Sequence, residues 1–243
     1  MFAFTSQGVF NPLSAFFGGF VAQEVVKAIT NKFSPTKQVF YYDAMEVLPD
    51  FNPDKHLQED TFSEFLKTIK TEQVGDRTDG LRIVLGKDMV DKIAYTNLFM
   101  VGAGAIGCEL LKNYAMLGVG TGKVNKENPK GGSIVLTDPD IIEVSNLNRQ
   151  FLFREKHLRM PKSQTAAAAA IYMNPMLKGN VIARQDKVHE GTAHIFTDKF
   201  FEDTHVVTNA LDNVKARIYI DARCVTAKTP LLESGTLGPK GHV

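Results

Sequence analysis

Residues 97–107 read Asn-Leu-Phe-Met-Val-Gly-Ala-Gly-Ala-Ile-Gly, an apolar run that ends in the spacing Gly-x-Gly-x-x-Gly. The apolar run predicts a buried strand, and the residues after it predict a helix over 105–117. Between a strand and a helix, this spacing is typical of nucleotide sites, because glycines let the backbone approach phosphate at the helix N-terminus. The candidate contacts are Gly102, Gly104 and Gly107. A glycine turn that binds no ligand is the alternative.

Further short apolar runs follow, with helix-forming segments between them. The expected strands cover 133–137, 181–183, 205–208 and 230–233. The expected helices cover 163–172, 192–201 and 213–226. Strands that alternate with helices predict βαβ units. The expected fold class is therefore α/β, Rossmann-like and doubly wound, with a mainly parallel sheet.

The N-terminal segment predicts a helix and a strand. Asn11–Pro12 is typical of a helix start, and apolar residues recur at helical spacing until about Asn31. Gly18–Gly19 lies inside this helix at a cost of about 1 kcal/mol per glycine, which close packing of another backbone usually offsets. We therefore expect a buried packing helix, followed by a short strand over 39–42.

Residues 48–80 are polar and turn-rich, and include Pro49 and Pro53. They predict a linker, with a short helix over 62–69. The expected division of the chain is therefore 1–47, a linker over 48–80, and 81–243.

The composition is that of a soluble globular protein, with 44% hydrophobic and 23% charged residues among 243. The net charge of +1 gives no reason to expect a nucleic acid or an anionic membrane as partner. The first basic residue is Lys27, so a secretory signal is not expected, and the most apolar stretch, 12–22, is about half the ~20 residues of a membrane span. The two cysteines, Cys108 and Cys224, indicate a reducing compartment, and packed thiols are expected at both.

Acidic residues follow the second predicted strand. Asp138 and Asp140 flank Pro139, where a carboxylate can accept hydrogen bonds from ribose hydroxyls. A simple turn around Pro139 is the alternative. Between the first helix and this strand, the glycine- and lysine-rich stretch 118–132 predicts a loop that is either a solvated insertion or a phosphate contact.

A polar run over 145–151 comes next. Arg149 is a permanent cation with a planar fork for phosphate, and Asn146 and Gln150 add neutral donors. Lys162 precedes the alanine-rich helix, with Ser163 as its expected N-cap, and an ammonium there needs a nearby anion because it adds to the positive end of the helix dipole. The alternative is an exposed surface lysine.

Asp212 follows the fourth predicted strand, where a side chain faces the ligand crevice of a parallel sheet. Its carboxylate could hold Mg²⁺, which prefers one or two carboxylates plus phosphate oxygens, or it could cap the next helix. A glycine turn, a ribose acid, two cations and a metal carboxylate on one edge suit Mg-ATP better than NAD. An NAD-binding oxidoreductase stays as the weaker alternative.

These motifs resemble the eukaryotic ubiquitin-activating enzymes. The resemblance rests on Gly-Ala-Gly-Ala-Ile-Gly-Cys-Glu-Leu-Leu-Lys-Asn (102–113), Ser-Asn-Leu-Asn-Arg-Gln-Phe-Leu-Phe-Arg (145–154), Asn-Ala-Leu-Asp-Asn-Val (209–214) and Pro-Leu-Leu-Glu-Ser-Gly-Thr-Leu-Gly (230–238). Residues 11–50 also resemble the segment just before the family's active adenylation domain. Enzymes that activate other ubiquitin-like proteins share the first and third motifs but match the N-terminal residues 11–50 less well, and they are the nearer alternative.

The resemblance implies a role for each motif residue. Ala105 would lie against the nucleotide, Asp138 would hold ribose, and Asp140 would lie near the same region. The residues implied at the phosphates and the metal are Asn146, Arg149 and Gln150, then Lys162 at the α-phosphate, Asp212 on Mg²⁺ and Asn213 beside it. The implied catalytic residues are Arg149 and Lys162. The cofactors implied are ATP and Mg²⁺.

The resemblance also implies the wider setting. The fold would be an incomplete ThiF/MoeB-like adenylation fold, with 1–47 the end of the preceding inactive half and 81–243 the start of the active, ATP-binding domain. The reaction would be adenylation of the ubiquitin C-terminal carboxylate, before thioester formation on a cysteine outside this chain. The partners would be ubiquitin, ubiquitin-conjugating enzymes acting through other domains, and the opposing inactive adenylation half. The location would be cytoplasm and nucleus.

Overall fold

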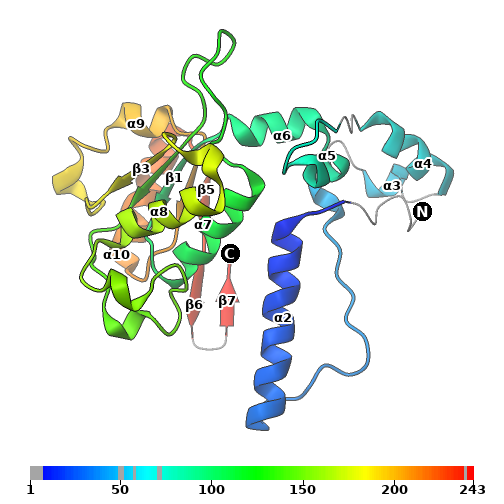
Figure 1. Ribbon diagram of the computed structural model, residues 1–243, viewed down its shortest axis with the longest axis horizontal. Helices are drawn as coiled ribbons and strands as arrows, with labels where there is room; N and C mark the ends of the chain where they lie inside the picture. Colours follow the sequence, from blue (N-terminus) through cyan, green and yellow to red (C-terminus); the bar gives the residue numbers. More distant parts are fainter. Residues whose placement is uncertain (1–7, 49–51, 57–58, 70–72, 238–239) are drawn as a thin grey trace. The chain divides into compact units, whose positions relative to one another are not determined.

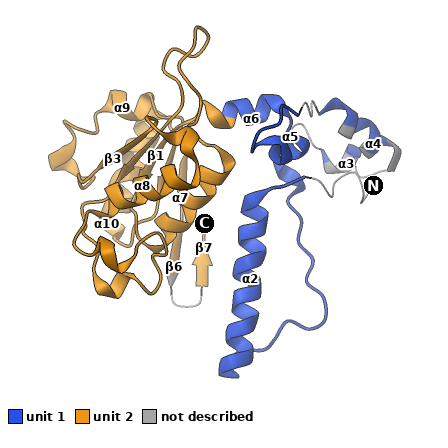
Figure 2. Ribbon diagram, in the orientation of Figure 1, with its two compact units in different colours: residues 1–92 blue, residues 93–243 orange. Residues whose placement is uncertain are grey.

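The computed structural model describes residues 8–48, 52–56, 59–69, 73–237 and 240–243. The chain separates into two compact units, residues 1–92 and residues 93–243 (Figure 2). Each unit is described by itself below, and the candidate site belongs to the second.

The second unit is built on a five-stranded parallel sheet with the order β3-β2-β1-β4-β5 (Figure 1). Its strands are β1 Asn97–Val101, β2 Ser133–Thr137, β3 Val181–Arg184, β4 Val206–Asn209 and β5 Leu231–Glu233. An antiparallel pair follows, β6 Gly235–Leu237 and β7 Lys240–His242. The five parallel strands lie within one residue of the predicted ones, and the doubly wound α/β class is confirmed.

The central strand β1 is buried on both faces because its side chains alternate between two cores. Leu98 and Met100 pack with helices α7 and α8, on Ala105–Leu117 and Lys162–Met173. Phe99 and Val101 pack on the other face with α9 Asp198–Glu202 and α10 Val214–Ala227. A strand covered on both sides needs an unbroken apolar sequence, which explains the run that opens the motif.

Among the described residues, the remaining helices are short, apart from α2. The α-helices are α2 Asn11–Thr30, α3 Pro53–His56, α4 Glu59–Thr68, α5 Asp79–Leu85 and α6 Lys87–Ala94. The 3₁₀ helices are η1 Met45–Val47, η2 Val144–Asn146, η3 Glu155–His157, η4 Pro175–Leu177 and η5 Glu190–Thr192. The predicted helix over 192–201 was too long, since only η5 and α9 form there.

Helix α2 has the predicted bounds but not the predicted burial. None of its residues is buried, and Val21 and Ile29 are 57% and 74% exposed. Apart from the adjacent residues and the backbone of α2 itself, no described atom lies within 4 Å of a Cβ built at Gly18 or Gly19. The expectation of a buried packing helix is therefore wrong for this structure, because the described segments cover only part of its apolar side chains.

The strand predicted over 39–42 is also wrong. These residues have no regular structure and pair with no described strand, and the rings of Phe40 and Tyr42 lie against α2. Phe40 stacks on Phe20 with 4.2 Å between ring centroids, and Tyr42 stacks on Phe16 at 4.0 Å. Aromatic residues favour strands only where a neighbouring strand is available, and here the rings pack on a helix instead.

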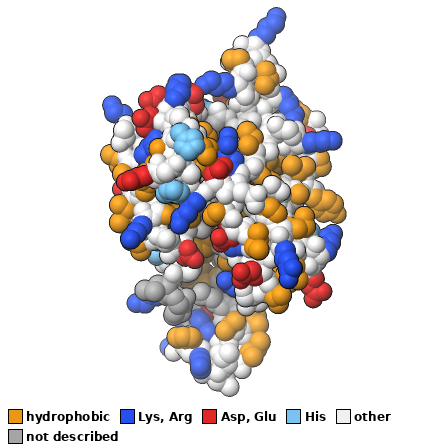
Figure 3. Space-filling model, turned by 90° about the vertical axis from the view of Figure 1, so that its left-hand side faces the viewer, with side chains coloured by type: hydrophobic (Ala, Val, Ile, Leu, Met, Phe, Trp, Pro, Cys, Tyr) orange, Lys and Arg blue, Asp and Glu red, His pale blue; other side chains and the backbone are white. Residues whose placement is uncertain are grey.

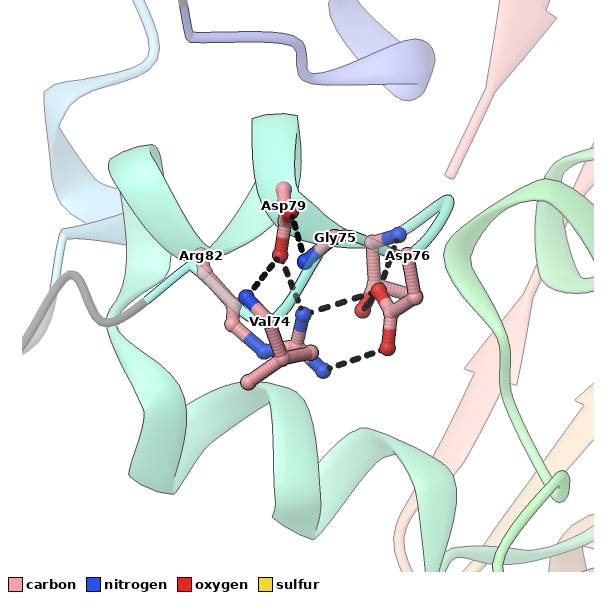
Figure 4. A network of polar contacts seen from close by, with 6 residues as sticks. Val74, Gly75, Asp76, Asp79 and Arg82 are labelled. Carbon is pink, nitrogen blue, oxygen red and sulfur yellow. Dashed lines mark hydrogen bonds and ion pairs between the residues drawn. The ribbon is translucent and has the colours of Figure 1, made fainter.

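An ion-pair network joins the end of the stretch predicted as a linker to helix α5 (Figure 4). The Arg82 guanidinium binds both carboxylate oxygens of Asp76, at 2.8 and 3.0 Å, and one of Asp79 at 2.6 Å. The Asp79 carboxylate also accepts the backbone N–H groups of Val74 and Gly75. Arg82 and these N–H groups hold the pKa of both carboxyls below their ordinary value of 3.8. The network fixes the turn before α5 to the helix itself.

Charge is mixed on the surface. On the face drawn in Figure 3, Lys and Arg side chains lie among Asp and Glu side chains, without a field of one sign. Among the described helices, none has the length and apolar content needed to cross a membrane.

The Arg82 network makes the start of α5 sensitive to acid. Because the folded-state pKa values of Asp76 and Asp79 are lowered, their contribution is present above about pH 3.8 and is lost as the pH falls below it. In Arg82→Gln, amide protection at the start of α5 should be lower at neutral pH and should depend less on pH. Hydrogen exchange followed by NMR measures this. Lys87→Gln is the control, since it removes a pair whose members are each about half exposed, and a similar loss there would contradict the assignment.

Candidate functional site

The site lies where the strand order reverses, between β1 and β4, at the carboxyl edge of the sheet (Figure 1). Gly102 leaves β1 with φ +102°, and a Cβ built on it would lie 2.5 Å from the Ala210 carbonyl oxygen. Its amide donates to Thr137, and the Ala210 amide donates to Val101, both at 2.8 Å. Only glycine allows this approach of two backbones, so Gly102 brings the segments after β1 and β4 together.

The other two glycines of the motif, Gly104 and Gly107, have different structural roles. A Cβ on Gly107 would overlap the Gly102 carbonyl oxygen, so this glycine lets α7 pack against the turn. A Cβ on Gly104 would meet nothing within 4 Å. Gly104 is the N-cap of α7, and no side chain caps the helix there. No described side chain therefore caps the first amide groups of α7, Ala105 included, which leaves them available to an anion at the helix N-terminus.

The Asp138 side chain links the glycine turn after β1 to the end of β2. One carboxylate oxygen accepts the Ala103 amide at 2.6 Å, and the other accepts the Asp140 amide across Pro139 at 2.8 Å. The turn around Pro139 is thus present, formed by the Asp138 side chain. Asp138 is 6% exposed, and burial raises the pKa of its carboxyl despite both hydrogen bonds. Its role at a ribose stays a prediction.

Lys162 is buried, so the surface-lysine alternative is wrong. Its Nζ lies 2.8 Å from an Asp140 carboxylate oxygen, and its backbone amide donates to the Asp140 carbonyl at 3.0 Å. Lys162 is the first residue of α8, whose N-cap is Pro161 and not the predicted Ser163. The anion that this ammonium needs at the positive end of the helix dipole is supplied here by Asp140.

The polar run after β2 forms a compact turn. Asn146 is the last residue of η2, and its side-chain oxygen accepts the backbone amide of the N-cap residue Glu143 at 2.9 Å. Arg149 is exposed and donates to the Ser145 carbonyl at 2.7 Å and to the Asn148 side chain at 3.0 Å. Gln150 is 3% exposed, and its Oε1 has no partner among the described residues. Arg149 is therefore available to solvent, whereas Asn146 and Gln150 are held inside the turn.

Asp212 and Asn213 lie in the turn between β4 and α10. The helix is capped by Asn213, whose side chain accepts the Lys215 and Ala216 amides at 2.9 and 3.3 Å. Asp212 is exposed and makes no hydrogen bond or ion pair with any residue that the structure describes. The capping alternative for Asp212 is therefore wrong, and its carboxylate is free to bind a ligand. Within the described ranges, no three His, Cys, Asp or Glu side chains gather as a metal cluster.

The loop over 118–132 lies away from the site. It leads into the amino end of β2, whereas the glycine turn follows the carboxyl end of β1, and parallel strands put these at opposite edges. Asn180 holds the loop's base through its Nδ2, which donates to the carbonyls of Gly120 and Gly132 at 2.7 and 2.8 Å. Lys123 donates to the Met176 carbonyl at 3.1 Å. The phosphate-contact alternative for this loop is wrong.

Both cysteines are packed thiols, as predicted. Cys108 and Cys224 are 0% and 2% exposed. Burial raises the pKa of the Cys108 thiol to about 12 and that of Cys224 to about 11. A nucleophilic cysteine needs a thiolate and access to solvent, and neither has them.

Two charged side chains at this edge were not predicted. Glu233, at the end of β5, accepts the Asn209 side-chain amide at 2.8 Å and lies 3.3 Å from Arg217 of α10. The position of Glu233 at a strand end was an available clue, since another acidic residue, Asp138, directly follows the end of β2. The sequence offered no such clue for Arg217, because an arginine in a helix is usually exposed to solvent.

Comparison with known proteins identifies the family. The model of the ThiF family matches residues 77–243, which include the whole parallel sheet and the candidate site. The chain belongs to the ThiF family.

This ThiF-family chain is similar to ubiquitin-activating enzymes over nearly its whole length, which confirms the resemblance. It is 49% identical to ubiquitin-activating enzyme E1 1 of Schizosaccharomyces pombe and 48% identical to human ubiquitin-like modifier-activating enzyme 1. Mouse ubiquitin-like modifier-activating enzyme 6 is 45% identical. Each alignment covers 99% of this chain but only 21–22% of the relative, so the chain spans about a fifth of the length of these relatives.

Solved structures support the fold. The tRNA N6-threonylcarbamoyladenosine dehydratase of E. coli, in complex with AMP, has a TM-score of 0.55 and 23% identity. The match covers 66% of this chain and 61% of that one. At this identity the likeness shows the ThiF-like fold alone.

The buried Asp138 predicts an unusual pH dependence. Asp138→Ala leaves the Ala103 and Asp140 amides without their partner, so the free energy of unfolding should fall by about 1–3 kcal/mol. Because the folded-state pKa is raised above 3.8, the stability that Asp138 contributes is fully present below that pH and declines as the pH rises through the folded-state value. The difference between wild type and variant should therefore be larger in acid, as measured by urea unfolding across the acidic range. The exposed Asp221→Ala is the control, and a difference that grows with rising pH would contradict this account.

Proposed function

We propose that this chain is the nucleotide-binding core of a ubiquitin-activating enzyme, which binds Mg-ATP and adenylates the C-terminal carboxylate of ubiquitin. The observation that carries the proposal is Lys162, a buried ammonium at the start of α8, paired only with the exposed carboxylate of Asp140 among the described residues. The Asp140 side chain is 63% exposed. An incoming phosphate can therefore replace Asp140 as the partner of the Lys162 ammonium, while the Asp140 carboxylate becomes hydrated.

The residues present fit ATP. The open amides at the start of α7 suit phosphate oxygens, and no side chain fills the space beside Gly104. Lys162 and Arg149 supply positive charge, which a triphosphate with about four negative charges needs. The unpartnered Oε1 of Gln150 offers an acceptor for a donor of the bound molecule. Nicotinamide chemistry has no use for this buried lysine, which disfavours the oxidoreductase alternative.

The residues also fit Mg²⁺ bound together with a nucleotide. Asp212 offers one exposed carboxylate without a described partner, and Mg²⁺ takes one or two carboxylates, with phosphate oxygens and water for the rest. When bound, the ion would neutralise phosphate charge. Asn213 caps α10, so Asp212 is not needed for the helix itself.

In the proposed reaction, the carboxylate of ubiquitin attacks the α-phosphorus of ATP, a P–O bond to pyrophosphate breaks, and ubiquitin adenylate forms. The attacking carboxylate is already ionised at neutral pH, so no protein base is needed. Lys162 stabilises the charge that develops at the α-phosphate, Arg149 binds the phosphates, and Asp138 with the glycine turn orients the nucleoside.

The wider setting is also proposed. Both cysteines are buried, so thioester formation uses a cysteine outside this chain. Ubiquitin, conjugating enzymes and an opposing inactive adenylation half are the proposed partners, in the cytoplasm and nucleus. The alternative substrate is a ubiquitin-like protein, because two of the relatives are named ubiquitin-like modifier-activating enzymes. Pyrophosphate exchange with purified ubiquitin and with each ubiquitin-like protein separates these substrates.

Lys162→Ala tests the adenylation role. In the complete enzyme that this proposal implies, ATP–pyrophosphate exchange should fall by about 10²–10³-fold, as for loss of another charge-stabilising donor. The fold should persist, because the exposed Asp140 carboxylate can be hydrated. The exposed Lys178→Ala is the control and should exchange normally. Near-normal exchange by Lys162→Ala would overturn the role.

Asp212→Asn tests the metal role. The variant should need a higher Mg²⁺ concentration for half-maximal binding of a fluorescent ATP analogue, because an amide oxygen carries no charge. Its melting temperature should stay that of the wild type, since Asn213 caps the helix. A sharply lower melting temperature with an unchanged Mg²⁺ requirement would show a structural role instead.

A further inference from the structure

The exposed Asp212 stands on a turn that is fixed on both sides. On one side, the Arg217 guanidinium donates to the Leu211 carbonyl, through Nε at 3.0 Å and also through Nη2. On the other side, the Asn213 cap accepts the Lys215 amide. Asp212 is thus held by its neighbours' backbone bonds and not by any described bond of its own carboxylate.

The Arg217 side chain is in turn anchored to the rigid sheet. Its Nε lies 3.3 Å from Oε1 of Glu233, the last residue of β5. The other oxygen of Glu233 accepts the side-chain amide of Asn209, the last residue of β4, which is fully buried. Ser234 completes the group by donating to the Asn209 carbonyl at 3.0 Å. The ends of two strands therefore fix the guanidinium that holds the turn.

This arrangement has a clear chemical consequence. A carboxylate that binds a metal must be free of other partners, yet its backbone must not move, since ordering it at the moment of binding costs affinity. An ion pair with Asp212 itself would occupy the carboxylate. Arg217 instead restrains Leu211, the residue before Asp212, and leaves both carboxylate oxygens of Asp212 without a described partner.

We propose that Arg217 is the positioning residue for Asp212, acting through the Leu211 carbonyl and anchored by Glu233 and Asn209. The proposal rests on the proposed role of Asp212 at Mg²⁺. Arg217 touches neither metal nor nucleotide in this assignment, so it sets the affinity for Mg²⁺ by keeping the turn in its binding-competent conformation.

Arg223 provides the matched control. It lies on the same helix and is equally well bonded, to the Phe196 carbonyl at 2.9 Å and to Asp198 at 2.8 Å, but it does not contact the turn. Arg223→Gln and Arg217→Gln should both lower the melting temperature. Only Arg217→Gln should affect Asp212, which separates positioning from general stabilisation.

The first measurement uses this chain without metal or nucleotide. Backbone order parameters from NMR relaxation should be about 0.85 over residues 210–213 in the wild type and in Arg223→Gln. In Arg217→Gln they should fall below about 0.6. Unchanged order parameters in Arg217→Gln would overturn the proposal.

The second measurement titrates Mg²⁺ against a fluorescent ATP analogue. Arg217→Gln should raise the Mg²⁺ concentration for half-maximal binding by about tenfold, as for loss of a residue that orients a metal ligand. In the Asp212→Asn background the same change should add nothing. Arg217→Lys, which keeps a cation beside Glu233, should fold if Arg217→Gln does not and should recover part of the affinity.

The outcomes distinguish the positioning role of Arg217 from the Mg²⁺ role of Asp212, on which it rests. If Asp212→Asn shifts the Mg²⁺ requirement and Arg217→Gln does not, only the positioning role is overturned. If Asp212→Asn shifts nothing, the metal role of Asp212 is wrong and the positioning role is overturned with it. Additive effects of the two substitutions would show that Arg217 does not act through Asp212.

Discussion

The site depends on the register of β1 between two parallel neighbours. Val101 is paired with Thr137 on one side and with Asn209 on the other, so three strands end at the same level. The residues that follow them, Gly102, Asp138 and Ala210, are thereby brought together from distant parts of the sequence. A register shift of one residue would turn the side chains of β1 to the opposite cores, so the two apolar clusters fix this alignment. Burial of β1 on both faces thus sets the geometry of the site.

The charges at this edge are only partly neutralised by one another. Asp138 is buried on backbone amides, and Lys162 pairs with a carboxylate that is mostly exposed. Asp212 pairs with no described residue. Buried charges such as those of Asp138 and Lys162 reduce the stability of a fold, and sites for charged ligands are where such a cost is commonly found. The paired Asp76, Asp79 and Arg82 of the first unit show the contrast, because there every charge serves the local fold.

Helix α2 shows how composition can misdirect an expectation of burial. Its sequence is apolar and contains two adjacent glycines, yet none of its residues is buried. The aromatic residues at 40 and 42 cover one part of it, and Val21, Val25 and Ile29 stay exposed. Periodicity predicts that a helix forms, whereas burial depends on whether another segment is present to cover it.

The sequence by itself determined the doubly wound sheet, its strands, the glycine turn and the nucleotide class of the site. These follow from local rules: alternating apolar strands and helices, and a glycine spacing that only a strand–turn–helix explains. The tertiary structure alone decided what each polar residue contacts. It made Lys162 the partner of Asp140 and set the loop over 118–132 at the opposite edge of the sheet. It also gathered Arg217, Glu233 and Asn209 from a helix and two strands. The reason is physical: hydrogen bonds and ion pairs act over about 3–4 Å between side chains far apart in the sequence, and only the packed sheet fixes those distances.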